Sequence, residues 1–433
     1  MLAMIAPVGA LLLSVALLLM GNGLQGTLLP VRAEIEHFST FGIGVMGSFY
    51  YMGFALGCVL CPYAVRAVGH IRAFTAMVAV AATVALIHAM FLSLYVWWPA
   101  RALTGFCFAG LYLVIESWLN DRATNQTRGA IFGIYTFINL TVITIGQFMI
   151  TLYDPAAFPL FALASILVSL AAVPIALTRA QAPAPIAAVR LRPRHLYHLS
   201  PVGIVGCAIV GLANGPFWSL GALYATGEGL DLTSLATFMG LTVIGGALAQ
   251  WPFGRLSDSR DRREVLALAS GLAVCAGLAL AIFGGLWTRA IFPFAVLFGA
   301  CAFPLYALCV AHANDMMAKD EFVEASSGLL LANGIGSAIG PLFASAAMSL
   351  LGPSGLFVYT AAIHAIMLAF VLYRIRQRAP AAPEERGSFV PVPESSLAVV
   401  TLDPRTDETP QDPRPEPPPP ETPPAQPPGA SPA

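Results

Sequence analysis

A series of apolar runs, each about as long as a lipid bilayer is thick, constrains this sequence more than any other feature. A helix needs roughly 20 apolar residues to cross the hydrocarbon core. We place twelve such runs at about residues 4–29, 42–65, 72–94, 98–119, 129–152, 157–178, 200–223, 234–253, 264–287, 290–311, 324–351 and 355–375. They lack the alternation of barrel strands, and only helices and closed barrels satisfy the backbone in lipid. The sequence therefore predicts an all-α integral membrane protein with twelve transmembrane helices.

The composition supports a membrane protein over a soluble one. Hydrophobic residues make up 57% of the chain and charged residues only 10%, whereas soluble domains have about 45–50% and about 25%. The first run has no basic residues before it and is too long for a signal-peptide core, so we interpret it as a membrane helix. All seven cysteines fall in apolar runs. Cys58-x-x-Cys61 has no second pair beside it, so packing is its expected role.

The arginines predict the orientation of the chain in the membrane. If the amino terminus is inside, most basic residues fall in inner loops or at the adjoining helix ends, among them Arg122, Arg128 and Arg374. The outer side then holds Arg32 and Arg289. Inner loops of membrane proteins are enriched in Lys and Arg. We therefore expect a multi-pass protein of the plasma (inner) membrane with both termini in the cytoplasm.

The two halves of the chain resemble each other. Asn22-Gly23 recurs as Asn214-Gly215 after 192 residues, and Asn120-Asp121 recurs as Asn314-Asp315 after 194. Matches at nearly one offset, in the same helix order, indicate a six-plus-six duplication. We expect an amino-terminal six-helix bundle at 1–178, a cytoplasmic linker at 179–199, a carboxy-terminal six-helix bundle at 200–377 and a tail at 378–433.

The tail differs in composition from everything before it. Its 56 residues include 17 prolines. Such a segment cannot bury a core, so we expect a disordered, Pro-rich cytoplasmic tail. A ligand role for partner domains is the alternative use of these prolines.

One short stretch concentrates charge between two apolar runs. Gly254–Arg263 holds six charged residues among its ten, so it cannot lie in lipid and is expected to be a short loop. A glycine lets a helix end lie close to its neighbour, and an aspartate can accept hydrogen bonds from a helix amino end or pair with arginine. We interpret the stretch as a breakable latch; a basic loop that only sets topology is the alternative.

At these residues the chain resembles the major facilitator superfamily (MFS). The family's signature loop, often written G-x-x-x-D-R-x-G-R-R, lies between helices 2 and 3 and again between helices 8 and 9. The second copy is well kept here. Aligned at Pro62 and Pro252, the first copy has Val68 in place of the aspartate. The gating residues that the resemblance implies are Gly254, Asp258, Arg260, Arg262, Arg263, Arg66 and Arg72.

Within the superfamily, the chain is most similar to the YcaD-type branch of uncharacterised transporters. The matching residues include Gly69-His70-Ile71-Arg72, Glu116-Ser117-Trp118-Leu119-Asn120 and Gly340-Pro341, and the resemblance covers about residues 5–376. It implies the MFS fold, with two pseudo-symmetric six-helix bundles around a central cavity. It also implies secondary active transport of a small molecule by alternating access, with a proton as the candidate coupling ion. The competing hypothesis is a non-transporting membrane sensor or scaffold that signals through the Pro-rich tail.

Glu116 is the one acid that we place within a membrane helix. Burial of a carboxylate favours its protonated form, which suits proton coupling. However, Glu116 lies near the cytoplasmic end of its helix, close in sequence to Arg122 and Arg128. A structural or gating ion pair is therefore the alternative role.

Polar and aromatic residues in the apolar runs mark the expected substrate path. Because helices 1, 4, 7 and 10 line the cavity in the family, the resemblance favours Asn22, Gln25, Arg101, Tyr112, Asn214, Trp218 and Tyr306. Asn139, Gln147, Gln250 and Asn333 lie in other helices. For any one of the uncharged residues, a hydrogen bond between helices is the alternative to a substrate contact. For Arg101, near the outer end of its helix, the alternative is that it snorkels to the outer interface.

Several classes of protein are excluded by what the sequence lacks. It has no Gly-x-x-x-x-Gly-Lys-[Ser/Thr] loop for ATP and no Gly-x-Ser-x-Gly nucleophile motif. It also has no cluster of metal-ligand residues. We therefore expect no enzyme activity and no cofactor. Its basic residues are scattered along membrane edges, so we expect no nucleic-acid partner, only the bilayer and an unidentified small-molecule substrate, with the chain acting as a monomer.

Overall fold

The structure, a computed structural model, is entirely helical in the part of the chain that it describes. It describes residues 9–122, 128–178, 193–317 and 322–377, together with Pro183, Gly387 and Phe389. Within these ranges, twelve helical segments are long and apolar enough to cross a membrane. The predicted architecture of twelve transmembrane helices is therefore confirmed.

The first half of the chain supplies six of the spans. They are α2 (Gly9–Ile35), α3 (Thr40–Val68), α4 (His70–Met90), α5 (Leu94–Arg122), α6 (Arg128–Phe148) with the 3-10 turn η2 (Met149–Leu152), and α7 (Pro159–Leu170) with α8 (Ala172–Ala176). Gly69, which separates α3 from α4, has a φ of +87°. That left-handed conformation favours glycine and lets the chain reverse directly from one span into the next.

The second half supplies the other six spans. They are α10 (Pro201–Gly227), α11 (Leu232–Ser259), α12 (Arg262–Phe283), α13 (Ile291–Ala302) with α14 (Pro304–Asn314), α15 (Phe322–Leu351) and α16 (Gly355–Gln377). The short elements α9 (Pro193–Leu199) and η3 (Thr288–Ala290) lie between spans. The predicted linker 179–199 thus contains a helix, and its remaining residues except Pro183 lie outside the described ranges.

Side-chain caps and prolines set several helix boundaries. Ser39 Oγ accepts from the backbone N–H of Gly42, and Ser200 Oγ accepts from that of Gly203. Each bond satisfies one of the donors that the first turn of a helix leaves free. Pro304 begins α14 and has no N–H to bond back into α13, which ends one residue before Phe303. This break leaves Phe303 at the junction of the two helices.

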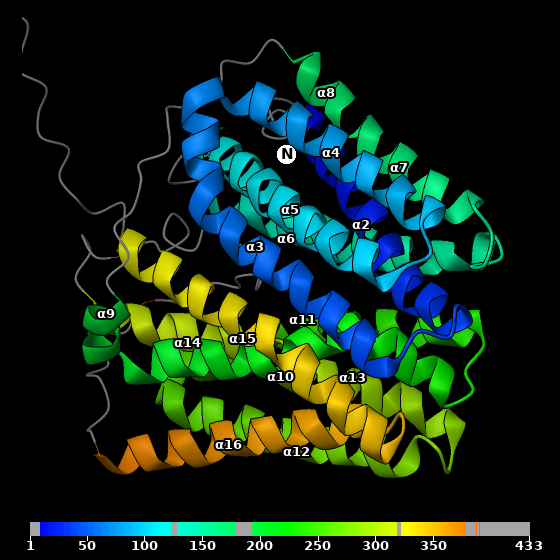
Figure 1. The fold of residues 1–433 in the computed structure, drawn as a ribbon. Helices are drawn as coiled ribbons and strands as arrows, with labels where there is room; N and C mark the ends of the chain where they lie inside the picture. The colour runs from blue at the N-terminus through cyan, green and yellow to red at the C-terminus, as the bar shows by residue number, and fades with distance from the viewer. Residues whose placement is uncertain are drawn as a thin grey trace, which may run out of the picture.

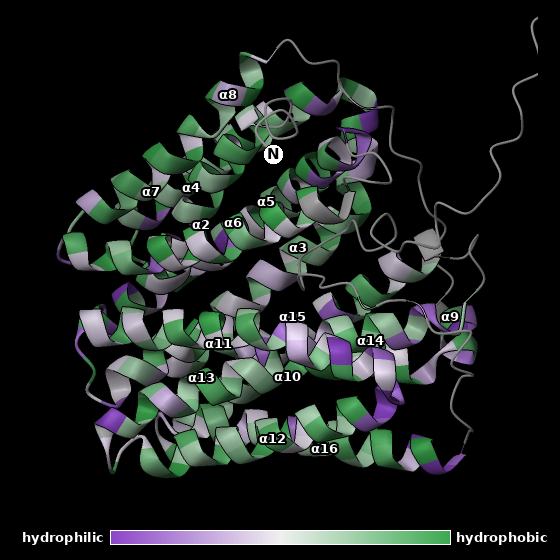
Figure 2. Cartoon of the chain, turned by 180° about the vertical axis from the view of Figure 1, so that it is seen from behind, coloured by the Kyte–Doolittle hydropathy of each residue, from purple (hydrophilic) through white to green (hydrophobic). Residues whose placement is uncertain are grey.

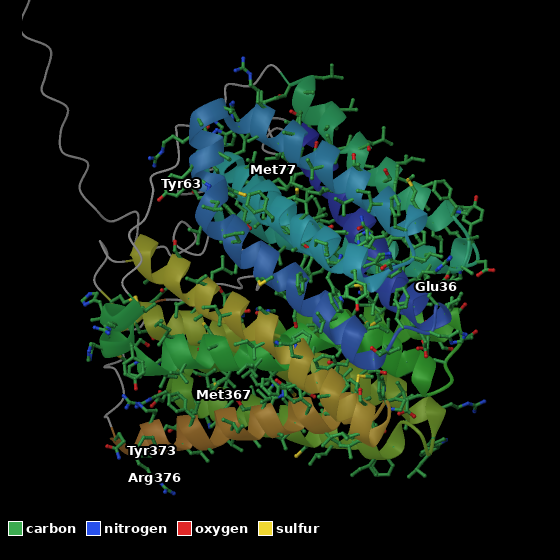
Figure 3. The ribbon with its side chains drawn as sticks, in the orientation of Figure 1. Glu36, Tyr63, Met77, Met367, Tyr373 and Arg376 are labelled. Carbon is green, nitrogen blue, oxygen red and sulfur yellow. The ribbon has the colours of Figure 1, made fainter. Side chains whose placement is uncertain are left out.

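The helices form two groups that diverge towards one end of the molecule. Figure 1 shows α2–α8 in one group and α10–α16 in the other, with α9 at the end where the groups are furthest apart. We call this the loop end, because Gly254–Arg263 also lies there, and we call the other the opposite end. Figure 3 places Glu36 at the opposite end, whereas Tyr63 and Arg376 lie well apart at the loop end.

Matching glycines hold corresponding helices together in the two halves. A Cβ on Gly53 would lie 1.8 Å from the carbonyl oxygen of Ala102, and one on Gly105 would lie 2.0 Å from that of Tyr50. In the second half, a Cβ on Gly245 or Gly299 would lie 2.2 or 1.9 Å from the oxygens of Val296 and Thr242. Only glycine permits such close backbone approach. The glycine pairs are offset by 192 and 194 residues, the same offsets as the sequence matches.

The two groups meet at the opposite end. Thr226 Oγ1 of α10 donates a 2.5 Å hydrogen bond to Glu34 Oε2 of α2. A Cβ on Gly44 of α3 would lie 2.1 Å from Ser345 Oγ of α15. These contacts hold the two groups together at this end, whereas the groups are furthest apart at the loop end (Figure 1).

The outer surface of the helices is suited to lipid. Figure 2 shows apolar residues along the helices and hydrophilic residues gathered near their ends. Large apolar side chains such as Leu248, Phe137 and Leu350 are exposed. Exposed apolar surface on this scale is expected for residues that face a bilayer.

Candidate functional site

A cavity of about 230 Å³ lies between the two groups of helices. Residues of α2, α3, α5 and α6 line it from the first half, and residues of α10, α11 and α15 line it from the second, together with Phe303. Most of these residues lie in the middle turns of their spans. The cavity is therefore placed at membrane depth, between the two halves, where a transported molecule could reach it.

Arg101 gives the cavity a positive charge. It is the only Asp, Glu, Lys, Arg or His among the lining residues. Its guanidinium carbon lies 4.4 Å from the centroid of the Tyr50 ring, an arrangement in which the ring stabilises the cation. Its Nε and Nη1 atoms are buried and have no hydrogen-bond partner among the described residues. The structure thus places Arg101 in the cavity, as the family resemblance implied.

Aromatic rings make up much of the remaining wall. Tyr50, Tyr51 and Phe54 of α3 lie on one side. On the other side, Trp218 and Phe303 are stacked with ring centroids 5.4 Å apart and planes 17° apart. Aromatic rings from both halves of the chain thus line the cavity.

Uncharged amides supply hydrogen-bonding groups to the cavity. Asn22, Asn139, Gln147, Gln250 and Asn333 all line it. The described residues offer no partner to Gln147 Oε1, Gln250 Oε1 or Asn333 Nδ2, although these atoms are buried. Buried polar atoms are usually hydrogen-bonded, so the cavity presents unused donors and acceptors.

The structure separates the predicted cavity residues into two sets. Asn22, Arg101, Tyr112 and Trp218 line the cavity. Gln25, Asn214 and Tyr306 do not, and all three are buried in the packing of the helices. Asn214 Nδ2 donates to the carbonyl oxygen of Ala302 at 3.2 Å, which is the interhelical bond that the sequence left open as an alternative.

Sequence reasoning missed the contribution of α3 to the cavity. Tyr50 and Tyr51 were not singled out, because aromatic residues in an apolar run are as typical of lipid or core contact. The sequence also shows the amides of α6, α11 and α15, but the family resemblance favours those of helices 1, 4, 7 and 10 as cavity residues. The sequence signal for these residues is a single amide side chain within an otherwise apolar run.

Glu116 lies outside the cavity lining but close to it in the chain. It is one helical turn beyond Tyr112 and its side chain is only 2% exposed. The Tyr135 hydroxyl donates a long, 3.4 Å hydrogen bond to its Oε1. The side chain of Arg128 lies outside the described residues, so the predicted contact with it is not placed.

Most of the stretch Gly254–Arg263, predicted as a loop, is helical. α11 continues to Ser259 and α12 begins at Arg262, which leaves only Arg260 and Asp261 between them. The reason is that Asp261 caps α12: its Oδ1 accepts from the backbone N–H of Arg263 at 3.0 Å. Burial acts to raise the pKa of Asp261, but its bonds to Arg263 outweigh this and hold the pKa below the usual value.

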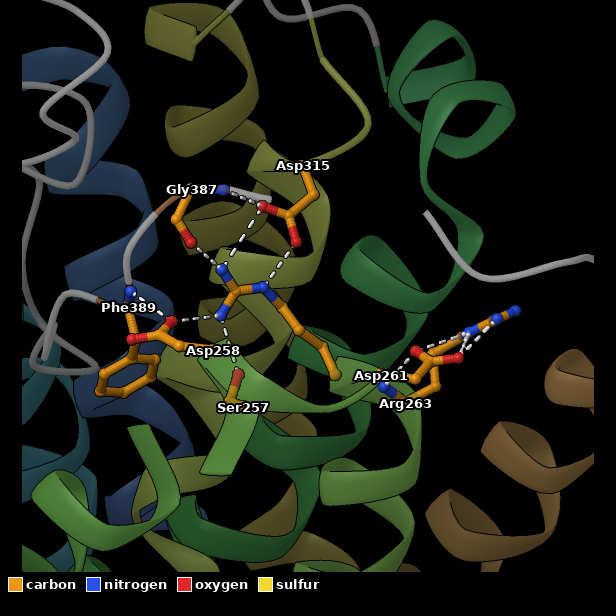
Figure 4. A network of polar contacts seen from close by, with 8 residues as sticks. Ser257, Asp258, Asp261, Arg263, Asp315, Gly387 and Phe389 are labelled. Carbon is orange, nitrogen blue, oxygen red and sulfur yellow. Dashed lines mark hydrogen bonds and ion pairs between the residues drawn. The ribbon is translucent and has the colours of Figure 1, made fainter. Parts of the chain in front are cut away.

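A buried ion pair ties the start of α12 to the end of α14. Arg262 Nε lies 2.5 Å from Asp315 Oδ2, and the two side chains are 2% and 3% exposed. Arg262 Nη1 also donates to Ser257 Oγ at 2.8 Å. Figure 4 shows the Asp315 and Ser257 side chains converging on this guanidinium. The sequence shows Asp315 only as part of a repeat and does not indicate that it is the main partner of Arg262.

Asp258, the expected acid of the latch, occupies a more open position. Its side chain is 42% exposed and lies 3.5 Å from Arg262 Nη1. Arg263 pairs instead with Asp261 at 2.7 Å, and Arg260 is exposed. In this conformation Arg262 and Arg263 therefore each have a closer carboxylate partner than Asp258.

Two residues of the tail contact this network. The backbone N–H of Gly387 donates to Asp315 Oδ1 at 3.0 Å, and its carbonyl oxygen accepts from Arg262 Nη2. The N–H of Phe389 donates to Asp258 Oδ1 at 2.8 Å, and Figure 4 shows the Phe389 ring beside these groups. The rest of the tail predicted to be disordered, 378–433, lies outside the described residues.

The matching positions of the first half are more exposed than those of this network. Arg66 and Arg72 are exposed, and Val68 is 47% exposed. Asp121, which matches Asp315 at an offset of 194, is 42% exposed and 3.9 Å from Arg122. The buried pair of Arg262 and Asp315 thus contrasts with the longer, more exposed pair of Asp121 and Arg122 at the matching position.

Comparisons with known proteins agree with this geometry. A family model described as the Major Facilitator Superfamily matches residues 11–308. The uncharacterized MFS-type transporter YcaD of Escherichia fergusonii is 26% identical over 372 residues, which cover 86% of this chain and 96% of the relative. YcaD of Shigella flexneri is 26% identical over 374 residues, which cover 84% and 95%.

Solved structures show the same fold at low sequence identity. The nucleoside transporter NupG matches with a TM-score of 0.71 at 12% identity, over 85% of this chain and 99% of NupG. A bacterial homolog of the human lysosomal transporter Spinster, in an inward-facing and occupied conformation, matches with a TM-score of 0.70 at 14% identity, over 88% and 98%. At these identities the likeness concerns the fold alone.

Proposed function

This chain belongs to the Major Facilitator Superfamily, and we propose that it is a secondary active transporter that carries a small molecule across the plasma membrane by alternating access. In this proposal it acts as a monomer with both termini in the cytoplasm. The loop end is then the cytoplasmic end, and the conformation described above is open to the inside.

The observation that carries the proposal is the cavity shared by the two halves. Its walls come from both bundles, so a rocking motion of one bundle against the other would expose it to either side in turn. The contacts of Glu34 with Thr226 and of Gly44 with Ser345 are among those that must break for the opposite end to open.

The charged stretch supports a gate at the loop end. Arg262 and Asp315 hold the ends of α11, α12 and α14 together as one unit. Asp258 projects from this unit and is partly exposed, so it can meet another helix end once its bond to Phe389 is broken. We therefore propose that Asp258 is the part of the latch that makes and breaks contact.

Glu116 is the residue that we propose for coupling to protons. It is buried beside Tyr135 and lies one turn from the cavity residue Tyr112. Because Glu116 is outside the cavity lining, a proton there would act on the packing of α5 against α6 rather than directly on bound substrate.

A ligand screen followed by a flux assay tests the proposal. A molecule that binds the folded state raises its thermal stability, so the purified protein is screened by thermal shift against metabolites and drugs. Compounds that bind are then assayed for flux into proteoliposomes. Trp218→Ala, in the cavity, should remove both signals, whereas the matched Trp287→Ala, exposed outside the cavity, should retain them.

The sensor hypothesis predicts a different outcome in the same assay. A sensor binds its ligand without moving it, so binding without flux under any imposed gradient contradicts the transporter proposal. Removal of residues after Arg378 separates the two hypotheses further. A transporter keeps its flux without the tail, whereas a sensor that signals through the tail loses its output.

A further inference from the structure

Arg101 suggests which class of molecule the cavity takes. It is the only charged residue in the lining, and its Nε and Nη1 atoms are buried without a partner among the described residues. A buried charge is costly unless it is paired, and arginine does not lose its proton in proteins. An anion bound in the cavity would balance this charge.

The other groups that line the cavity indicate the shape and polarity of an anion that would fit it. The guanidinium presents a planar pair of donors that suits a carboxylate. The stacked rings of Trp218 and Phe303 face the cavity from the other half of the chain. A flat, unsaturated body would pack on these rings, while Asn333 Nδ2 and Gln250 Oε1, which have no partner among the described residues, would bind polar substituents.

We propose that the substrate is a small organic anion, a carboxylate on an aromatic or other flat unsaturated body, whose charge is bound by Arg101. This inference rests on the proposed function and names the substrate class of the same cavity. The cavity volume of about 230 Å³ is below the roughly 300–1,000 Å³ typical of drug-sized ligands. It therefore fits a small metabolite better than a large drug.

A charge series tests the proposal on the purified full-length protein. The probes are benzoate, cinnamate and 4-hydroxybenzoate, each with its uncharged amide, and benzylamine as the cation. Binding is measured by calorimetry and thermal shift. Hydrogen bonds to a charged group are worth about 1.5–3 kcal/mol, so we expect carboxylates to bind about tenfold or more tightly than their amides.

Matched arginine variants assign the effect to Arg101. Arg101→Gln should abolish the preference for carboxylates, whereas Arg289→Gln, an exposed arginine outside the cavity, should preserve it. Equal or tighter binding of the amides or of benzylamine overturns the proposal, as does a failure of every carboxylate to bind. If uncharged or cationic compounds are carried, the proposed transport function is supported and only the proposed substrate class is wrong. If carboxylates bind but none is carried, the proposed binding site is supported and the proposed transport function is wrong.

The tail supports a second, independent inference about the charged stretch. Gly387 and Phe389 engage Arg262, Asp315 and Asp258 through their backbone groups. The Phe389 ring lies so close to Gly254 that a Cβ there would be 2.4 Å from its Cδ1 atom. The tail therefore occupies the glycine and the aspartate through which a latch would have to contact another helix.

We infer that this tail segment is a brake that holds the loop end open. While Phe389 covers Gly254 and bonds to Asp258, neither residue can contact a helix of the other bundle. Closure of the loop end thus requires the tail to leave. The tail biases the equilibrium between the two conformations by its affinity for only one of them.

Spin labels across the loop end test the brake without any substrate. Labels on exposed Tyr63 and Tyr373, one in each half, report the separation of the bundles. Phe389→Ala should move a measurable part of the population to a shorter distance, and removal of residues after Arg378 should do the same. Leu397→Ala, another apolar tail residue, is the control and should leave the distances unchanged. Distances in both Phe389→Ala and the truncated protein that match those of the unaltered chain overturn the inference.

Discussion

Arg262 and Asp315 form a buried ion pair, with Nε and Oδ2 2.5 Å apart, that joins the first residue of α12 to the residue after α14. The pair lies 53 residues apart in sequence and fixes the helix ends around the charged stretch. Asp258, beside it, is left partly exposed. Arg262 is thus held in a buried ion pair, whereas Asp258 is exposed enough to change its partner.

Loss of one partner of this pair should destabilise the protein strongly. Asp315→Asn leaves the Arg262 charge buried without its main counter-charge, which costs about 3–5 kcal/mol in comparable cases. Unfolding of the purified protein by heat or denaturant measures the change. Asp121→Asn, at the matching and more exposed position of the first half, should cost less than about 1 kcal/mol. Similar losses for the two variants would contradict the assignment.

Asp258→Asn should shift the protein towards the conformation that is open at the loop end. The amide oxygen of asparagine can still accept from the N–H of Phe389, so the tail contact survives. The negative charge needed to hold another helix end is lost. Labelling of a cysteine placed in the loop-end opening should therefore become faster. Unchanged labelling would count against Asp258 as part of a latch.

Glu116→Gln distinguishes a role of Glu116 in proton coupling from a structural role. If Glu116 carries the proton, the variant should lose transport driven by a pH gradient but keep substrate exchange, which needs no net proton movement. Both modes are measured in the same proteoliposomes. Loss of expression or of thermal stability would instead support a structural role for the contact with Tyr135.

Asp261 should make the stability of the loop end depend on pH. Its pKa is lower in the folded protein than in the unfolded chain, so its stabilising contribution is present above the unfolded pKa of about 3.9. The contribution is lost as pH falls through the lower, folded pKa. Asp261→Asn can still cap α12 but loses the charge that pairs with Arg263, at a cost of about 1 kcal/mol at neutral pH.

A pH series checks this prediction. The stability difference between the unaltered chain and Asp261→Asn should be largest near neutral pH and should shrink below about pH 4. A difference that grows as the pH falls would contradict the assignment. Asp231, which caps α11 at the opposite end, also has a lowered pKa because it accepts hydrogen bonds from Ser234. The same pH series on Asp231→Asn therefore compares the two ends of the molecule.

The fold could be predicted from the sequence because each span is a local property. The length and polarity of a run decide whether it crosses a bilayer, and the repeated residue pairs at offsets near 192 indicate the duplication from the sequence alone. The rotation of a helix about its axis is not local. Gln25 and Asn214 therefore point into helix packing, while Tyr50 and Tyr51 reach the cavity. The pairing of Arg262 with Asp315 depends on how α12 meets α14, which no spacing in the sequence reveals.

The central claim is that the cavity is exposed to the two sides in turn, and a reversible lock tests it most directly. Glu34 and Thr226 are in hydrogen-bond contact at the opposite end, so cysteines at both positions, in a chain without its native cysteines, can be joined by a short bis-maleimide linker that contains a reducible bond. Flux of a bound compound in proteoliposomes is measured before and after reduction of the linker, with each single cysteine as a control. We predict that the linked protein binds the compound but does not carry it, and that reduction restores flux. Full flux with the linker intact would contradict the account.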